Sequence, residues 1–343
     1  MRRYFVWACI GLVAGMAATL ALLAFRQQQG IRRAEQLIAD FRVEKVGDIG
    51  STEVLKILPL MEYQTSDPRL HSEVGLSYLV DTDQNRILYD VGLNASGETP
   101  SPLQRNMATL GVELEGIDMV FISHNHLDHV GGLHWQRMNT FSLGKQQTPF
   151  PNPRTQLIAP DFMSYPGLFA VYADKPMQLG EGLGSTGIGS TGIGTTGTLP
   201  RQLAAGWIDE QALVVNVAGL GGVIIVGCGH QTVSNLLRRY DEAFSEPLYG
   251  IVGGLHFPVP EGRFKVGPVD VQRQLASGSG LFNPISMEEV EREVAMLKKR
   301  NLGLIAVSAH DSSDEVIELI RREFGEAHRY VRVGEEIVIS APR

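Results

Sequence analysis

The chain has 343 residues, of which 43% are hydrophobic and 20% are charged, and its formal net charge is -8. This is the composition of a globular protein, and the length suits one large α/β domain or two smaller ones. The negative charge, with no long basic run beyond the N-terminal region, argues against a nucleic acid as the main partner. The two cysteines, Cys9 and Cys228, are too few for a disulfide framework.

The first predicted element is an apolar helix. Tyr4 to Phe25 form a run of 22 residues without a charge, enough to cross about 30 Å of hydrocarbon as a helix. Arginines flank both ends of the run, so the positive-inside rule does not decide its orientation. We interpret residues 1–28 as an uncleaved single-pass membrane anchor, with the rest of the chain outside the cytoplasm. The alternative is a cleaved signal segment, which would release a secreted protein.

After this helix we predict a linker over residues 29–50 and a single domain over residues 51–343. The first part of the domain contains apolar runs of strand length at residues 55–60, 74–80, 86–92 and 117–123. Beyond residue 200, strand-like and helix-like segments alternate. Strands that are followed by β–α alternation predict a layered α/β domain with two sheets between helices.

Two segments of this domain are predicted to be irregular. Residues 184–198 read GSTGIGSTGIGTTGT, three near-copies of a five-residue unit. Because so much Gly, Ser and Thr cannot bury enough surface to offset the entropy of ordering, we predict a mobile surface loop over residues 185–198. Residues 257–284 begin directly after His256 and are long for a loop, which indicates an irregular insertion. A lid or a pocket wall is one role open to it, and a plain surface loop is the other.

The strongest chemical signal is the stretch SHNHLDHVGG at residues 123–132. It begins at the end of the apolar strand VFIS, and loops at the carboxyl ends of strands are where α/β proteins place their sites. Imidazoles and a carboxylate at this spacing form a ligand set for zinc, iron or manganese. We therefore predict a metal site that contains His124, His126, Asp128 and His129.

This motif resembles the signature of the metallo-β-lactamase superfamily. The segments ILYDVG, DEQALVV, VGCGH, VGGLHF and VSAHDSS also resemble that family in order, so the resemblance covers most of residues 73–340. The series is most similar to the branch of the archaeal dihydropterin ribofuranosyl-aminobenzene phosphate synthase. The resemblance implies a four-layer αββα sandwich, preceded here by the N-terminal transmembrane helix, with one or two divalent metal ions. Zinc is favoured, with manganese or iron as alternatives.

By position, the resemblance assigns His124 and His126 to a first metal ion, and Asp128 and His129 to a second. Many superfamily members have a further histidine before the strand that reads ALVV here, and a bridging aspartate after a glycine at a strand end. This chain has neither, and offers Asp209 and Glu210 before that strand. The resembled branch uses a Gly-Cys-x-His element, which assigns His230 to the first ion.

The last ligand is open between two histidines, because His256 and His310 both close an apolar strand. The branch completes its second metal site with the later histidine, which favours His310, although this chain continues with Asp-Ser-Ser where the branch often has Cys-Thr-Gly. His256 is then a substrate-facing residue or an alternative ligand. Cys228 is either a ligand or a small buried residue beneath the site. Asp90, in LYDVG, resembles the acidic residue that hydrogen-bonds a ligand histidine.

Metal ions with an open coordination position lower the pKa of bound water and polarise a carbonyl or phosphoryl oxygen. We therefore predict a membrane-tethered hydrolase that cleaves an ester, lactone, amide or phosphoester bond of a small molecule, with Asp128 as the catalytic residue that aligns or deprotonates the water. A synthase or transferase acting on a phosphorylated pterin-type substrate is one alternative, and an iron-dependent oxidoreductase or metal sensor is another. The fold does not identify the substrate, and nothing in the sequence indicates an oligomeric state.

Overall fold

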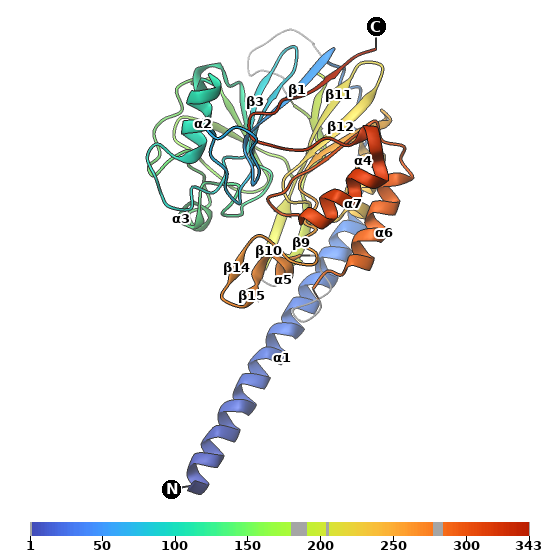
Figure 1. Ribbon diagram of the computed structural model, residues 1–343. Helices are drawn as coiled ribbons and strands as arrows, with labels where there is room; N and C mark the ends of the chain where they lie inside the picture. Colours follow the sequence, from blue (N-terminus) through green and yellow to red (C-terminus); the bar gives the residue numbers. More distant parts are fainter. Residues whose placement is uncertain (1, 180–190, 204–205, 277–283, 343) are drawn as a thin grey trace.

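Two β-sheets pack face to face between layers of helices in the computed structural model, which describes residues 2–179, 191–203, 206–276 and 284–342 (Figure 1). The first sheet has seven strands in the order β17-β1-β2-β3-β4-β5-β6, and the second has six in the order β16-β13-β12-β11-β8-β7. The strands of the first sheet are β1 (Val54–Met61), β2 (Ser77–Asp81), β3 (Arg86–Tyr89), β4 (Met119–Phe121), β5 (Gln156–Ala159), β6 (Phe169–Tyr172) and β17 (Ile337–Ser340). The strands of the second are β7 (Met177–Gln178), β8 (Ile193–Thr195), β11 (Leu213–Val217), β12 (Gly221–Val226), β13 (Leu248–Gly253) and β16 (Leu304–Val307).

Two short antiparallel ladders and the helices complete the described structure. The ladders are β9 (Leu199–Leu203) with β10 (Gly206–Glu210), and β14 (Lys265–Val266) with β15 (Val269–Asp270). The helices are α1 (Arg2–Asp40), α2 (Pro102–Leu110), α3 (Leu133–Arg137), α4 (Val233–Ala243), α5 (Val271–Leu275), α6 (Met287–Lys298) and α7 (Asp314–Phe324), with 3-10 turns at Leu114–Gly116 and Gly325–Ala327.

The main core lies between the two sheets. Tyr89 and Phe121 of the first sheet meet Val215 and Ile225 of the second in one buried cluster. Successive residues of a strand point to opposite faces of the sheet, so every second residue points away from this core. These outward-facing apolar residues must be buried by another layer. That layer is helical: α2 packs on the outer face of the first sheet, and α4, α6 and α7 pack on the outer face of the second. The fold is therefore a four-layer αββα sandwich, and the predicted fold class is confirmed.

Helix α1 differs from the predicted arrangement. It continues without a break to Asp40, so the predicted boundary after residue 28 and the first part of the predicted linker lie inside one helix. Its apolar segment stands clear of the domain, whereas Ile31 and Ile38 are buried where α1 contacts β9. The helix is long and apolar enough to cross a membrane, which fits either an anchor or a signal sequence.

The prediction of a mobile loop over residues 185–198 is wrong in its second half. Residues 180–190 lie outside the described residues. Residues 193–195 form β8, which pairs with both β7 and β11 and is buried along its whole length. The prediction considered only the small side chains of the repeat. Backbone hydrogen bonds to two neighbouring strands and the burial of Ile193 in the core offset the entropy that is lost on ordering.

This placement predicts a large effect of a change in the repeat. The Ile193→Ala variant is expected to lower the free energy of unfolding by about 2–5 kcal/mol, because it leaves a cavity between the sheets. Chemical denaturation of the detergent-solubilised protein measures the loss. Val338→Ala, on the exposed side of β17, is the matched control and should change stability by less than about 0.5 kcal/mol. Equal stability of the two variants would contradict the assignment of β8 to the core.

The predicted irregular insertion over residues 257–284 is partly regular, since it contains β14, β15 and α5; residues 277–283 lie outside the described part of the chain. Gln272 of α5 donates to the backbone oxygen of His310 at 2.9 Å, and its own backbone oxygen lies 3.4 Å from His256 Nε2. The segment therefore lies against the strand ends that carry two of the predicted site residues.

Candidate metal centre

The predicted site residues come from strand ends that meet at one edge of the sandwich. β3 and β4 run parallel in the first sheet, and β12, β13 and β16 run parallel in the second. Asp90 and the motif at 124–129 follow the first pair, and Cys228, His256 and His310 follow the other three strands. Because the carboxyl ends of parallel strands lie at the same edge of a sheet, segments far apart in the sequence converge here.

Glycines allow the two sheets to approach closely at this edge. A Cβ atom on Gly227 would overlap Ser123 Oγ, and one on Gly254 would overlap the backbone oxygen of Gly227 and the carboxylate of Asp311. Any residue with a side chain would push the strand ends apart. The Gly-rich sequence of these two turns is thus required by the close contact that assembles the site.

Three imidazole nitrogens face one another in the first group of potential ligands. His126 Nδ1 lies 3.1 Å from His124 Nε2 and 3.1 Å from His230 Nε2. Two nitrogens about 2.0–2.1 Å from one tetrahedral zinc ion lie about 3.3 Å apart, so this spacing fits three ligands of a single ion. The other ring nitrogen of His230, Nδ1, is buried without a hydrogen-bond partner among the described residues.

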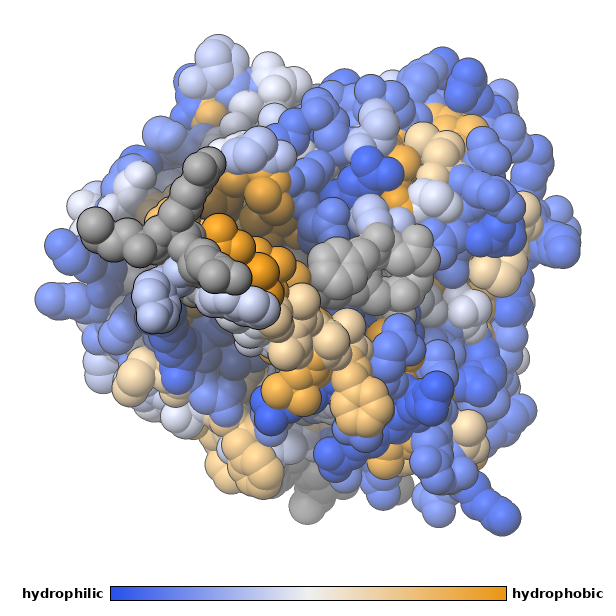
Figure 2. Space-filling view, turned by 90° about the horizontal axis from the view of Figure 1, so that it is seen from below, coloured by the Kyte–Doolittle hydropathy of each residue, from blue (hydrophilic) through white to orange (hydrophobic). Residues whose placement is uncertain are grey.

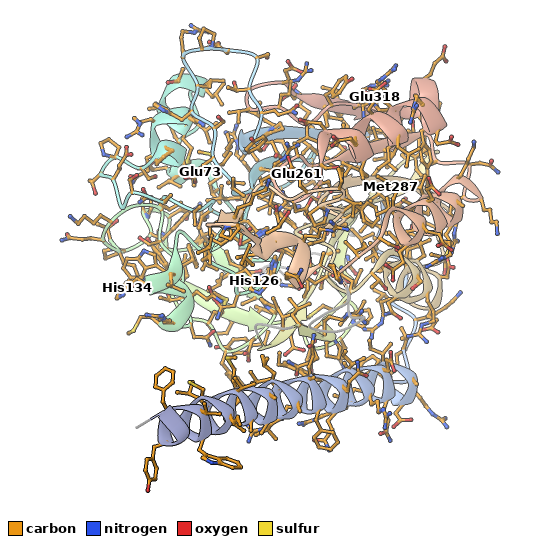
Figure 3. All side chains as sticks on the ribbon, turned by 60° about the horizontal axis from the view of Figure 1, so that its bottom comes forward. Glu73, His126, His134, Glu261, Met287 and Glu318 are labelled. Carbon is orange, nitrogen blue, oxygen red and sulfur yellow. The ribbon has the colours of Figure 1, made fainter. Side chains whose placement is uncertain are left out.

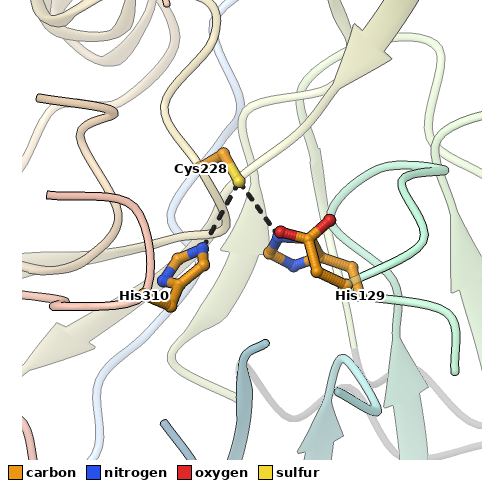
Figure 4. A group of neighbouring side chains, drawn as sticks. His129, Cys228 and His310 are labelled. Atoms are coloured by element: carbon orange, nitrogen blue, oxygen red, sulfur yellow. Dashed lines mark hydrogen bonds and ion pairs between the residues drawn. The ribbon is translucent and has the colours of Figure 1, made fainter. Parts of the chain in front are cut away.

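A second group surrounds the thiol of Cys228 (Figure 4). Its Sγ lies 3.0 Å from His129 Nε2 and 3.4 Å from His310 Nε2. Asp128 Oδ2 lies 3.6 Å from His129 Nε2, and the ligand atoms of these four residues are all within 4.8 Å of one another. Cys228 is also within this distance of two histidines of the first group. The thiol therefore lies between the two groups of potential ligands, and its burial raises the pKa of Cys228.

His256 lies at the side of the centre. It forms a third close group with Cys228 and Asp311, and its ring centroid is 4.5 Å from that of His230. His310, by contrast, joins the group that contains Asp128 and His129. His310, and not His256, thus lies with the two residues that the resemblance assigned to the second ion. Metal binding by all of these residues stays a prediction.

Hydrogen bonds to the ring nitrogens that face away from the centre determine where His124 and His129 carry a proton. Ser123 Oγ donates to Asp90 Oδ2 at 2.6 Å, so it can only accept from His124 Nδ1, 2.8 Å away. Asp90 Oδ2 also accepts from His129 Nδ1 at 2.7 Å. Both rings therefore carry a proton on Nδ1 and direct Nε2 towards the centre, which is the ring orientation that a metal ligand needs. The contact with His129 is of the kind predicted for Asp90.

An equivalent arrangement on the other side of the centre was missed by the sequence interpretation. Glu62, directly after β1, accepts a hydrogen bond from the hydroxyl group of Ser308. Ser308 Oγ in turn accepts a hydrogen bond from His310 Nδ1 at 2.5 Å. Glu62 is fully buried, and burial raises its pKa to about 7. A lone glutamate after a strand has no sequence pattern of its own. The spacing Ser-x-His at 308–310 was the only available signal.

Glu210 has a role that the sequence did not reveal. Its Oε1 accepts the backbone N–H groups of Cys228 at 2.9 Å and Gly229 at 2.8 Å, and its Oε2 accepts that of His230 at 2.6 Å. The carboxylate therefore holds in place the loop that carries two of the predicted site residues. Burial raises the pKa of Glu210 to about 7, although the three backbone donors oppose that rise.

Burial lowers the pKa of the imidazoles, whereas neighbouring carboxylates raise it. Burial lowers the pKa of His126 and of His256 to about 4, so both rings are neutral at pH 7 and can offer a lone pair. Burial also lowers the pKa of His129, but the carboxylates of Asp128 and Asp90 outweigh it and raise the value to about 9. The same carboxylates that favour a proton on His129 would favour a metal cation in its place.

The arrangement around Glu62 predicts a measurable loss in metal binding. The Glu62→Gln variant is expected to bind zinc about 10–100-fold more weakly, because an amide no longer forces Ser308 to accept from His310 Nδ1. Competition with a chromogenic chelator measures the affinity. Glu53→Gln, at an exposed position just before β1, is the control. If Glu62→Gln binds zinc as tightly as the control does, the prediction is wrong, and Ser308 orients His310 without the carboxylate of Glu62.

Pockets open from the centre on the side of the domain that faces α1. One, of about 790 Å³, is lined by His230 and His256 and extends to Glu35 of α1. Another, of about 390 Å³, connects His126 with Trp207 of β10. Figure 3 shows His126 on this side, above α1. Both pockets have the size of small-molecule sites.

Comparison with known proteins agrees with this architecture. Residues 73–136 match the family model of the metallo-beta-lactamase superfamily. The crystal structure of Tm1679, described as a metal-dependent hydrolase of the beta-lactamase superfamily, is similar with a TM-score of 0.54. The chain has the metallo-β-lactamase fold. The similarity covers 83% of this chain and 99% of Tm1679 at 19% sequence identity, so it shows the fold alone.

Two curated proteins of Methanocaldococcus jannaschii are similar in sequence to part of this metallo-β-lactamase fold. A 7,8-dihydropterin-6-methyl-4-(beta-D-ribofuranosyl)-aminobenzene-5'-phosphate synthase is 37% identical over 91 residues, 25% of this chain and 29% of the synthase. An uncharacterized protein is 29% identical over 89 residues, 26% of this chain and 32% of that protein. The chain thus matches less than one third of the length of either relative. The predicted resemblance to the superfamily, and to the synthase within it, is confirmed.

Proposed function

We propose that this protein is a membrane-tethered, metal-dependent hydrolase of a small-molecule substrate. The observation that carries the proposal is the convergence of imidazoles, the Asp128 carboxylate and the Cys228 thiol at one buried edge of the sandwich. The proposed ligands are His124, His126, Asp128, His129, His230 and His310. This donor set suits one or two divalent ions, of which zinc is the first choice and manganese or iron the alternatives.

The chain's own residues support hydrolysis of an ester, lactone, amide or phosphoester bond. A divalent ion bound here would supply hydroxide from water at neutral pH. Asp128 is half-buried, with its Oδ2 towards His129, so its carboxylate can align an incoming water and accept its proton. Asp90 and Ser123 keep the ligand histidines in one tautomer throughout, which keeps the site preorganised.

The membrane part of the proposal rests on α1. Its apolar segment of Tyr4 to Phe25 is exposed and long enough to span a bilayer once, and we place the domain outside the cytoplasm. Mass spectrometry of the protein from the membrane fraction tests the anchor. An intact N-terminus supports it, and a soluble chain that begins near residue 28 would show a cleaved signal instead.

Metal analysis combined with a substrate panel tests the hydrolase. The full chain, purified in detergent, is expected to contain about one or two metal ions and to hydrolyse at least one of four matched ester, lactone, amide and phosphodiester probes. Activity should disappear with a chelator and return with added zinc. No turnover of any probe by the metal-loaded protein would contradict the proposal, and redox-active iron would favour an oxidoreductase or sensor.

A second candidate function has one observation in its favour. The 91-residue similarity at 37% identity to the Methanocaldococcus synthase suggests a synthase or transferase acting on a phosphorylated pterin-type compound. Incubation of the metal-loaded protein with a phosphorylated pterin and a nucleophilic acceptor separates the two functions. A coupled product would support the synthase, whereas release of free phosphate or alcohol in water would support the hydrolase.

A further inference from the structure

Helix α1 is held against the end of the domain at which the candidate metal centre opens. Figure 1 shows α1 leaving the domain at this end, next to the β9–β10 and β14–β15 ladders. At Gly30 the helix approaches β9 so closely that a Cβ atom would overlap the side chain of Gln202. The guanidinium of Arg33 lies 5.6 Å from the centroid of the Trp207 ring on β10. These contacts hold the C-terminal part of α1 against the domain.

The apolar part of α1 ends where the domain begins. Phe25 is the last residue of the uncharged run, and Gln27, two positions later, is already buried on the domain. At 1.5 Å per residue the two are separated by only about 3 Å along the helix axis. If the run spans a bilayer, the membrane surface must therefore lie against this end of the domain.

Apolar side chains are exposed at the same end, around the openings of the site. We call five of them the apolar rim; they are between 40% and 59% exposed and comprise Leu133, Trp207, Phe264, Val266 and Val269. The first two line the pocket that reaches His126, and Phe264 lines a neighbouring pocket with Leu127. Figure 2 shows this end from below, where the apolar residues of α1 project in front of the domain and polar residues surround them.

We propose that the apolar rim rests on the lipid bilayer, so that the candidate metal centre opens at the membrane–water interface. The position of α1 supplies the argument for lipid as the occupant, because a membrane-spanning run that stops at the domain surface brings this face to the headgroups. Trp207 and the two valines of the β14–β15 hairpin are suited to that depth. The five residues of the rim are uncharged, so the contact that we propose is apolar. The inference rests on the membrane span in the proposed function, but not on hydrolysis.

Depth-dependent fluorescence quenching of the full chain tests the inference. With Cys9 replaced by Ser, single cysteines are introduced by Val266→Cys, Leu12→Cys or Gln84→Cys and labelled with an environment-sensitive fluorophore. Cys228 is only 2% exposed, and the parent without an added cysteine measures any labelling of it. The proteins are placed in phosphatidylcholine nanodiscs that contain lipids with a nitroxide either near the headgroup or deep in the acyl chain.

Each label reports on one part of the inference. Residue 266 is expected to be quenched about twofold by the nitroxide near the headgroup, and residue 12 by the deep one. Residue 84 is the matched control, because the β2–β3 turn is at the opposite end of the strands from the site, beside Val54. It should not be quenched by either lipid.

Two results would overturn the inference. Quenching at residue 12 but not at residue 266 leaves the membrane anchor standing and shows that the apolar rim is away from the lipid. No quenching at either residue removes the anchor and the docking together. Because neither readout depends on metal or turnover, failure of the hydrolase proposal would leave both readouts unchanged.

Discussion

The Asp128→Asn variant is expected to lose about 10²–10⁴-fold in kcat while it keeps its fold. An amide has nearly the same size as the carboxylate but cannot take a proton from water and is a weaker metal ligand. Asp128 is half-buried beside His129, so the substitution leaves no large cavity. Steady-state kinetics on the best probe of the substrate panel measures the loss, and circular dichroism checks the fold.

The metal content of this variant separates the two roles of Asp128. A loss of about one ion per chain would mean that Asp128 acts mainly as a ligand, and full metal content with low kcat would mean that it acts mainly on the water. Asp174→Asn, at an exposed position outside the two groups of potential ligands, is the matched control. Activity of Asp128→Asn equal to that of the control would exclude Asp128 from catalysis.

The Glu210→Ala variant is expected to lower the free energy of unfolding by about 3–5 kcal/mol and to reduce metal content. It removes the only acceptor, among the described residues, for three buried N–H groups of the loop at 228–230. That loop carries Cys228 and His230, so its displacement affects both groups of potential ligands. Denaturation of chelator-treated protein measures stability without a contribution from the metal, and elemental analysis measures metal content.

Two further variants make this prediction specific. Glu291→Ala removes an exposed carboxylate on α6 and should change stability by less than about 0.5 kcal/mol. Glu210→Gln retains one acceptor oxygen but turns an NH₂ group towards a backbone donor, so its stability should fall between the other two. If Glu210→Gln were as stable as the unmodified protein, the three hydrogen bonds would not be the reason for the effect.

The sequence predicted the layers of the fold because they depend on local patterns. Runs of strand length, followed by β–α alternation, are sufficient to indicate two sheets between helices. The motif at 123–132 was equally readable, because its four potential ligands lie within six residues of one strand end. Their spacing is a property of the local backbone, which a sequence shows directly.

Local patterns were misleading where distant contacts determine the conformation. The Gly-Thr repeat reads as a flexible loop, yet residues 193–195 form a buried strand because β7 and β11 supply hydrogen bonds on both sides. Residues 29–40 read as the start of a linker, yet they continue α1 because β9 provides a surface on which Ile31 and Ile38 are buried. In both cases the partner that stabilises the segment is remote in sequence.

Periodicity and short-range spacing were sufficient to predict two sheets between helices and the first four potential ligands. The packing of the folded chain sets how the remaining groups are arranged. It brought His310 rather than His256 next to Asp128 and His129, and it assigned Glu62 and Glu210 to support the site. These contacts form where strand ends from two different sheets pack together. The spacing of residues along the chain does not show which strand ends will meet.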